Sequence, residues 1–259
     1  MASVTQRISQ ISQPRGGLIN PKTFSVTQLN DDINLYPEEN IHPGITGLIV
    51  DYLTRLTLTS DKGETFNISL IGANIADQKV HGCLDIALEW FHNINGIDDE
   101  SIINARKLVS FDVWFRDPTS AKIERHFNLS NPNAYTLFNI KIMIQRSIHF
   151  FNEYGPAIQS GFTFEPNGYT PLIDTGDGDF LTEDTLWDFK VSKSKINSKQ
   201  TLQLMTYYIM GKHSGQPIYD NIQNIGIFNP RLNIVFQKNT NTIDKNIYRF
   251  IEHDIIGYK

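Results

Sequence analysis

The spacing of hydrophobic residues predicts a largely helical first half of the chain. Between residues 43 and 58, apolar side chains recur every three or four positions, and Pro43 stands where the first helical turn would lie. The same periodicity predicts further helices at about residues 69–94, 98–116 and 134–154. Residues 31–155 are therefore expected to form a mainly helical portion.

After Gly155-Pro156 the pattern changes to short runs of alternating or β-branched and aromatic residues, which indicate strands. Helices are predicted at about residues 199–211 and 243–258. The predicted strands lie at residues 161–164, 169–174, 185–191, 224–228 and 232–236, with a hairpin arm around Asp179. This order predicts an α/β (α+β) fold in which residues 156–259 form a small mixed β-sheet flanked by helices.

The first 30 residues and the chain length complete the expected organisation. Residues 1–24 are rich in Ser, Gln, Gly and Pro and contain no acidic residue, so residues 1–30 are expected to form a flexible leader or a strapped-down arm. A length of 259 residues with 40% hydrophobic composition suits one globular unit spanning residues 1–259.

The strand predicted at residues 185–191 carries the candidate chemistry. Because side chains alternate along a strand, Asp188 and Lys190 share one face, which we expect to be the chemical face, while Trp187 and Phe189 share the other, the core face. A turn at residues 182–184 would return the chain and bring Asp179 beside Asp188. Like charges held together repel, whereas a hard cation such as Mg²⁺ accepts one or two carboxylates together with waters and phosphate oxygens. The sequence therefore predicts a divalent-metal site.

These residues resemble the PD-(D/E)XK nuclease superfamily, in particular its RecB-like and lambda-exonuclease-like branches. Asp179 matches the first acidic ligand, and Asp188-Phe189-Lys190 matches the acidic-x-Lys element. The Gln-x-x-x-Tyr pair of those branches is matched by Gln203 and Tyr207 on the predicted following helix. The resemblance covers about residues 156–236. It implies a restriction-endonuclease-like core and places the protein in prokaryotic or phage DNA processing, restriction or defence.

The resemblance also implies a mechanism of metal-assisted phosphodiester hydrolysis. Asp179, Asp188 and the backbone carbonyl of Phe189 would hold Mg²⁺ or Mn²⁺, and Lys190 would orient a water and stabilise developing negative charge. Gln203 would bind a phosphate or a metal-bound water, and Tyr207 would position the backbone or Lys190. Structural alternatives stay open: Lys190 as a plain salt-bridge partner of Asp188, and the Gln–Tyr pair as helix packing.

Basic residues after the predicted site are candidates for nucleic-acid contacts. Lys193, Lys195 and Lys199 follow the predicted strand, and Arg231 is expected on a later strand. The alternative for the three lysines is a solvated loop. The formal net charge of −5 argues against a protein coated in basic residues for non-specific binding.

A second candidate site lies on the first predicted helix. Residues 47–55 resemble the RecB-branch helix with its Gly-x-x-x-His element, but Asp51 stands in place of the His and Arg55 in place of an acidic residue. Asp51 is therefore a weak candidate metal ligand and Arg55 a weak candidate nucleic-acid contact. The alternative is an ion pair between two residues four apart on a helix surface.

Composition narrows the remaining function classes. No apolar stretch approaches the ~18 residues that a membrane span needs, so we expect a cytoplasmic protein without membrane contact. The single cysteine, Cys83, excludes an internal disulfide and a Cys-based zinc site. Phosphate-binding glycine loops and zinc-binding His patterns do not occur.

The leading interpretation is thus a metal-dependent nuclease that cleaves nucleic acid, with DNA as the favoured substrate. The rival is a catalytically inactive nuclease-fold module that binds DNA or assembles with a partner protein or with copies of itself.

Overall fold

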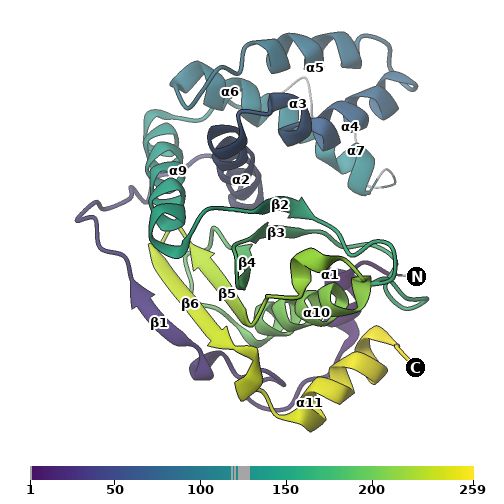
Figure 1. Ribbon diagram of the computed structural model, residues 1–259. Coiled ribbons are helices and arrows are strands. Elements are labelled where there is room, and N and C mark those ends of the chain that lie inside the picture. Colours follow the sequence, from purple (N-terminus) through teal and green to yellow (C-terminus); the bar gives the residue numbers. More distant parts are fainter. Residues whose placement is uncertain (1, 118, 120, 122–128) are drawn as a thin grey trace. The chain divides into compact units, whose positions relative to one another are not determined.

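The computed structural model describes residues 2–117, 119, 121 and 129–259, and its contacts divide the chain into two compact units (Figure 1). One unit comprises Met1–Asn30 with Phe151–Lys259, and the other comprises Asp31–Phe150. This differs from the expected single globular unit. The first 30 residues join the β-sheet unit because they add a strand and a helix to it.

The helical unit contains six α-helices and one 3₁₀ turn that lie wholly within its described residues. Their bounds are α2 (Pro43–Thr59), α3 (Lys62–Thr65), α4 (Asn67–Asp77), α5 (Cys83–His92), α6 (Asp99–Leu108), η2 (Val109–Phe111) and α7 (Asp112–Arg116). The long helix α9 (Ala134–Tyr154) begins in this unit and ends in the other.

The helix predicted at residues 69–94 is divided into α4 and α5. Gly82 adopts a left-handed φ of 94°, which interrupts the helical ladder, and Oδ1 of Asp77 accepts hydrogen bonds from the N–H groups of Gly82 and Leu84. The helix predicted at residues 98–116 is likewise divided, here by the 3₁₀ turn η2.

A buried carboxylate ties three of these helices together. Asp112, 2% exposed, accepts hydrogen bonds from the hydroxyls of Tyr52 and Ser69, each at 2.5 Å. Burial and the adjacent negative charge of Asp112 raise the pKa of Tyr52, so the phenol keeps the proton that it donates. The helical unit therefore has a buried polar contact that joins three of its helices.

The other unit is built on a six-stranded mixed sheet with the order β1-β6-β5-β4-β3-β2. The strands are β1 (Ser25–Gln28), β2 (Gln159–Phe162), β3 (Gly178–Leu181), β4 (Thr185–Phe189), β5 (Asn224–Asn229) and β6 (Ile234–Asn239). Only the neighbours β4 and β5 are parallel, and α10 (Ser198–Ser214) makes the crossover between them. The predicted α+β class, a small mixed sheet flanked by helices, is confirmed.

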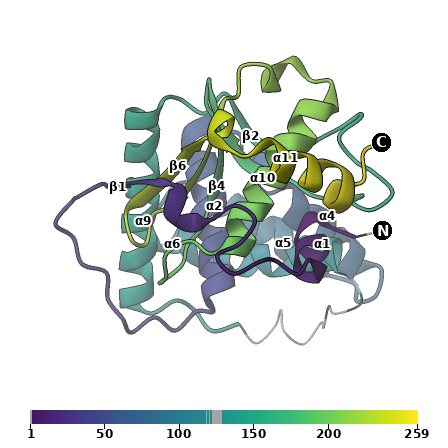
Figure 2. The same cartoon turned by 90° about the horizontal axis from the view of Figure 1, so that it is seen from below.

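Both faces of the sheet are covered within this unit. On one face α10 packs on β4 and β5, together with α1 (Val4–Gln10) and the π-helix η5 (Ile251–Ile256) that continues α11 (Lys245–Phe250), as Figure 2 shows from below. On the other face the end of α9 supplies Phe151 and Tyr154, whose rings lie 4.9 Å from Phe180 and 5.4 Å from Trp187. Three 3₁₀ turns complete the unit: η1 (Pro21–Thr23), η3 (Pro217–Tyr219) and η4 (Thr240–Thr242).

One predicted strand is absent from the structure, and one observed strand was not predicted. Residues 169–174 form no strand, because Thr170 starts a turn: its hydroxyl accepts hydrogen bonds from the N–H groups of Leu172 and Ile173. Conversely, β1 was not predicted. Its four residues are all exposed and show no alternation, and only pairing with β6 makes them a strand. No described helix is long and apolar enough to span a membrane.

The Trp187 side chain is the largest fully buried group of the sheet unit, and we predict that Trp187→Ala lowers the free energy of unfolding by about 3–5 kcal/mol. The substitution removes the ring packed on Tyr154 and the bond from Nε1 to Thr182 Oγ1. Urea unfolding measures the loss. Val26→Ala on β1, where the side chain is 57% exposed, is the control and should change stability by no more than about 0.5 kcal/mol. Equal effects of the two substitutions would contradict the assigned core.

Candidate active site

The pairing of β3 with β4 brings the two candidate carboxylates together. Phe180 lies opposite Trp187 and Leu181 opposite Leu186 in an antiparallel register. Continuing this register by one pair places Asp179 opposite Asp188, and directly opposite residues project their side chains from the same face. The hairpin predicted from sequence is present, and continuing its register would set the two aspartates side by side.

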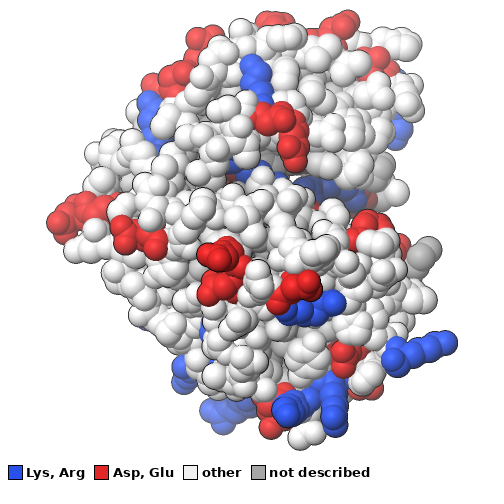
Figure 3. Space-filling model, viewed as in Figure 1, with Lys and Arg blue, Asp and Glu red and all other residues white. Residues whose placement is uncertain are grey.

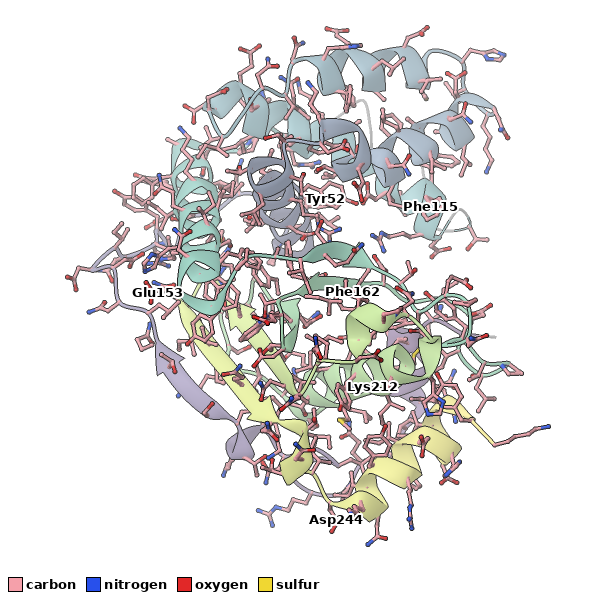
Figure 4. The ribbon with its side chains drawn as sticks, viewed as in Figure 1. Tyr52, Phe115, Glu153, Phe162, Lys212 and Asp244 are labelled. Atoms are coloured by element: carbon pink, nitrogen blue, oxygen red, sulfur yellow. The ribbon has the colours of Figure 1, made fainter. Side chains whose placement is uncertain are left out.

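A glycine makes room for this end of the hairpin. Gly178 pairs with Phe162 of β2, and a Cβ atom at residue 178 would lie 1.9 Å from the Phe162 ring (Figure 4). A larger residue at this position would displace the Phe162 ring. The glycine before Asp179 thus leaves room for that ring over β3.

Asp179 is held by the backbone of β4. Its Oδ2 accepts a hydrogen bond from the N–H of Phe189 at 2.6 Å. The next N–H along the strand, that of Lys190, points the other way and bonds to the carbonyl of Phe228 on β5. Because N–H and C=O of one residue point to the same side of a strand, the Phe189 carbonyl also points toward β3 and Asp179.

Asp188 is almost fully buried and is paired with Lys190. The Asp188 side chain is 3% exposed, and its Oδ1 lies 2.8 Å from Nζ of Lys190, whose side chain is 28% exposed. The salt bridge that we set as the structural alternative for Lys190 is thus present. Lys190 lies one residue beyond the end of β4, so its ammonium group connects a buried carboxylate with the protein surface.

The face of β4 that carries Asp188 is not a separate chemical face. Leu186 and Leu181, on the same side of the sheet, are fully buried in the core formed with α10. The core expected on the Trp187 and Phe189 face is present, but the Asp188 face is not purely chemical as expected. Hydrophobic residues occupy both faces, because α10 covers the Asp188 side, and the charged side chains lie at one end of the β3–β4 pair.

Gln203 and Tyr207 lie one turn apart on α10, and Gln203 Nε2 donates to the Tyr207 hydroxyl at 2.8 Å. The helix starts where Asn197 caps it and exchanges side-chain hydrogen bonds with Gln200. Tyr207 is 5% exposed and its ring packs 5.4 Å from that of Phe164. The pair thus lies on the helix that covers Asp188, and part of its role is packing.

The electrostatics of Tyr207 connect it with the carboxylates. Burial raises the pKa of Tyr207 well above its usual value, and the negative charge of Asp188 raises that pKa further, with smaller contributions from Asp179 and Asp177. The phenol therefore keeps its proton at neutral pH and can donate a hydrogen bond near these carboxylates. Asp177 is a site neighbour that the Asp-x-Lys pattern alone did not single out.

The amino-terminal helix α1 also reaches this region, which sequence reasoning missed. Thr5 Oγ1 lies 3.5 Å from Gln203 Nε2, and a Cβ atom at Gly176 would approach Val4 at 2.7 Å. The missed signal is the Ser3-x-x-Gln6 capping box, which is formed in the structure and marks a helix start inside the supposed leader.

The basic candidates divide into two groups. Lys193, Lys195 and Lys199 are exposed, the first two in the segment between β4 and α10 and the third in the first turn of α10. Arg231, by contrast, lies in the turn between β5 and β6 and is 9% exposed. The expectation that Arg231 lies on a strand is wrong, and its burial makes it a poor contact for a nucleic-acid backbone.

Asp51 and Arg55 belong to the helical unit and bond to each other. On α2 the Arg55 Nε lies 2.9 Å from Asp51 Oδ1, with side chains 15% and 17% exposed. This is the i,i+4 ion pair that we weighed against a site role, although it is more buried than a helix-surface pair. The assignment of Asp51 as a metal ligand and Arg55 as a nucleic-acid contact stays a weak prediction.

The donor set at the β3–β4 end suits a hard divalent cation. Asp179, Asp188 and the Phe189 carbonyl supply oxygen ligands only, and Mg²⁺ commonly takes one or two carboxylates and completes its shell with water and phosphate. No group of three or more His, Cys, Asp or Glu side chains arranged for a metal occurs in the described part of the chain. Any such ion would therefore depend on solvent and substrate for much of its coordination.

The chain matches no family model, no curated protein and no solved structure.

The Asp188–Lys190 pair should be energetically coupled. We predict that a double-mutant cycle with Asp188→Asn and Lys190→Met gives a coupling energy of about 1–3 kcal/mol, because the carboxylate is buried and its bond to the ammonium is short. Urea unfolding of the four proteins measures it. Additive single effects would show that the bridge makes no net contribution to stability.

Proposed function

We propose that this protein is a metal-dependent nuclease that hydrolyses phosphodiester bonds of nucleic acid, with DNA as the favoured substrate, by a PD-(D/E)XK mechanism. The observation that carries the proposal is the β3–β4 register, whose continuation by one pair would set Asp179 opposite Asp188, together with the bond from Lys190 to Asp188. A chance Asp-x-Lys sequence on a solvated strand would not be expected to meet a second carboxylate at a buried sheet position.

The order of elements around the site gives further support. Three antiparallel strands, β2 to β4, are followed by the crossover helix α10 and by β5, which is parallel to β4. The order of strands, crossover helix and strands agrees with the one predicted from the sequence, which resembles that of the nuclease core. Gln203 and Tyr207 stand on that crossover helix, where the resemblance expects them.

Asp179, Asp188 and the Phe189 carbonyl are the groups that would hold Mg²⁺ or Mn²⁺. When bound, such an ion polarises the scissile phosphate and acidifies a water. Asp179 already bonds to the Phe189 N–H, so the two potential ligands on β3 and β4 are fixed relative to each other before any ion arrives. This preorganisation reduces the cost of assembling the site.

Lys190 is the residue suited to the reacting phosphate. Its ammonium group is partly exposed while its partner carboxylate is buried, so it can turn between Asp188 and an incoming phosphate oxygen. There it would orient the attacking water and stabilise negative charge as it develops. Tyr207, protonated at neutral pH, would donate a hydrogen bond to the substrate, and its hydroxyl accepts one from Gln203 Nε2.

The most direct test incubates the purified protein with end-labelled linear DNA and with circular DNA, single- and double-stranded, in Mg²⁺ or Mn²⁺. Cleavage that needs the metal supports the proposal, and the two DNA forms separate endonuclease from exonuclease action. Calorimetric titration of the same metals, with Asp188→Ala as control, identifies the rival: a protein that binds DNA without metal binding or cleavage is an inactive nuclease-fold module.

Lys190→Ala should reduce cleavage by about 10²- to 10³-fold or more, because it removes the positive group next to the reacting phosphate. Single-turnover rates measure the effect. Lys245→Ala, on the exposed surface of α11, removes the same charge elsewhere in the unit and should leave the rate unchanged. A wild-type rate in Lys190→Ala would refute the catalytic role and leave only the salt bridge.

The exposed lysines between β4 and α10 should bind the nucleic-acid backbone. Replacing Lys193, Lys195 and Lys199 together by Gln is expected to reduce the slope of log affinity against log salt by up to about 0.9 per lost contact on duplex DNA. Fluorescence anisotropy in EDTA measures binding apart from cleavage. An unchanged slope would identify these lysines as a solvated loop.

A further inference from the structure

Two segments far apart in the sequence carry basic residues and no acidic ones. Residues 1–30 and 190–219 together contain eight of the 23 Lys and Arg residues and none of the 28 Asp and Glu residues. The rest of the chain is correspondingly acidic. On the face drawn in Figure 3, basic side chains are mixed with acidic ones on a mostly uncharged surface, which fits the net charge of −5.

The fold brings these two segments into contact. Gln13 Nε2 donates to the carbonyl of Ser198 at 3.2 Å, and Thr201 Oγ1 donates to the carbonyl of Ile19 at 2.6 Å. A Cβ atom at Gly17 would lie 2.4 Å from Cβ of Ser198, so the backbones approach as closely as a glycine allows. The amino-terminal arm is thus fastened to the first turn of α10, where Lys199 lies.

Two exposed basic residues of the arm stand on hydrogen-bonded turns beside this contact. Arg15 is at the tip of a turn closed by the bond from Gly17 N–H to the Pro14 carbonyl, and Gly16 supplies the φ of 95° that this turn requires. Lys22 lies in η1, where its N–H bonds to the Asn20 side chain. Ile19 and Phe24, both buried, anchor the chain between and after them.

Three other basic residues of the two segments are already engaged by protein groups. Arg7 donates to the carbonyls of Asp254 and Ile255, Lys212 donates to those of Tyr219 and Asp220, and Lys190 bonds to Asp188. The remaining five are exposed and form no ion pair with a described residue. They are Arg15, Lys22, Lys193, Lys195 and Lys199, and we name them the arm–loop surface.

We propose that the arm–loop surface binds the phosphate backbone of duplex DNA, with Arg15 and Lys22 extending the contact beyond the segment between β4 and α10. The identity of the partner rests on the proposed nuclease function, whereas the charge of the surface does not. A surface with five cations and no carboxylate from either segment fits a polyanion, and its fixed turns limit the conformational entropy lost on binding.

The relation to the candidate active site follows from α10. Lys199, Gln203 and Tyr207 are spaced four residues apart and so follow one face of the helix, and Thr5 of the arm approaches Gln203 on that face. A backbone bound at Arg15 and Lys199 is therefore next to the helical face that leads to Tyr207 and the carboxylates. The arm would position substrate and take no part in the chemistry.

The experiment measures binding of a labelled 20-base-pair DNA duplex in EDTA over a series of salt concentrations. The variant R15Q/K22Q should reduce the slope of log affinity against log salt by roughly 2, and its melting temperature should match the wild type. The control K245Q/R249Q removes two exposed charges from α11 of the same unit and should leave the slope unchanged. A slope in R15Q/K22Q equal to that of the control overturns the proposal.

The assay distinguishes failure of this proposal from failure of the nuclease function. DNA binding that depends on Arg15 and Lys22, in a protein that cleaves nothing with Mg²⁺ or Mn²⁺, supports the surface and refutes the nuclease. If the protein cleaves DNA but its DNA binding does not depend on Arg15 and Lys22, the nuclease function is supported and the arm–loop surface is refuted. Binding to vesicles of anionic phospholipid without binding to the duplex would also overturn the proposal, since the surface would then serve a membrane.

Discussion

The antiparallel pairing of β3 with β4 is the constraint on which the rest of the candidate site depends. Side chains alternate strictly along a strand, so a shift of one residue would move Asp188 to the face occupied by Trp187 and Tyr154. The register is fixed by hydrophobic residues on both faces: Leu181 and Leu186 pack beneath α10, while Phe180 and Trp187 pack against the end of α9. Core packing thereby determines where the carboxylates meet.

Asp188 is only 2% exposed, and burying a charged carboxylate destabilises a fold unless nearby groups compensate the charge. Lys190 bonds to Asp188, and the phenol of Tyr207 stays protonated nearby. Asp179 accepts a hydrogen bond from the backbone N–H of Phe189. This bond takes the place of a backbone hydrogen bond between the strands. These contacts compensate the negative charge of the two aspartates.

The amino-terminal arm is an integral part of the sheet unit and not an attached leader. It contributes β1 to one edge of the sheet, α1 to the face of α10 and two turns to the start of that helix. A flexible tail would hold its basic residues at random. Here Ile19 and Phe24 anchor the arm, so the arm and the segment before α10 together present positive charge on one part of an otherwise acidic protein.

The sequence by itself determined the elements whose signals are local. Pro43 and the apolar spacing marked α2, the 134–154 pattern marked α9, and β-branched and aromatic residues marked β4 and β5. Asp188, Lys190, Gln203 and Tyr207 were found because their spacing along one strand and one helix is visible without the fold. The wrong predictions lie at residues that form turns. Gly82 divides a predicted helix, and Thr170 starts a turn where a strand was predicted.

Only the tertiary structure decided the contacts between distant segments. β1 has no alternation of its own and exists because β6 offers a partner, and Arg231 changed from an expected contact to a buried residue because of its turn. Gln13 and Ser198, 185 positions apart, meet only after the sheet and α10 have formed. The physical reason is that periodicity records which face of an element is apolar, whereas the identity of the neighbour depends on how all the elements pack together.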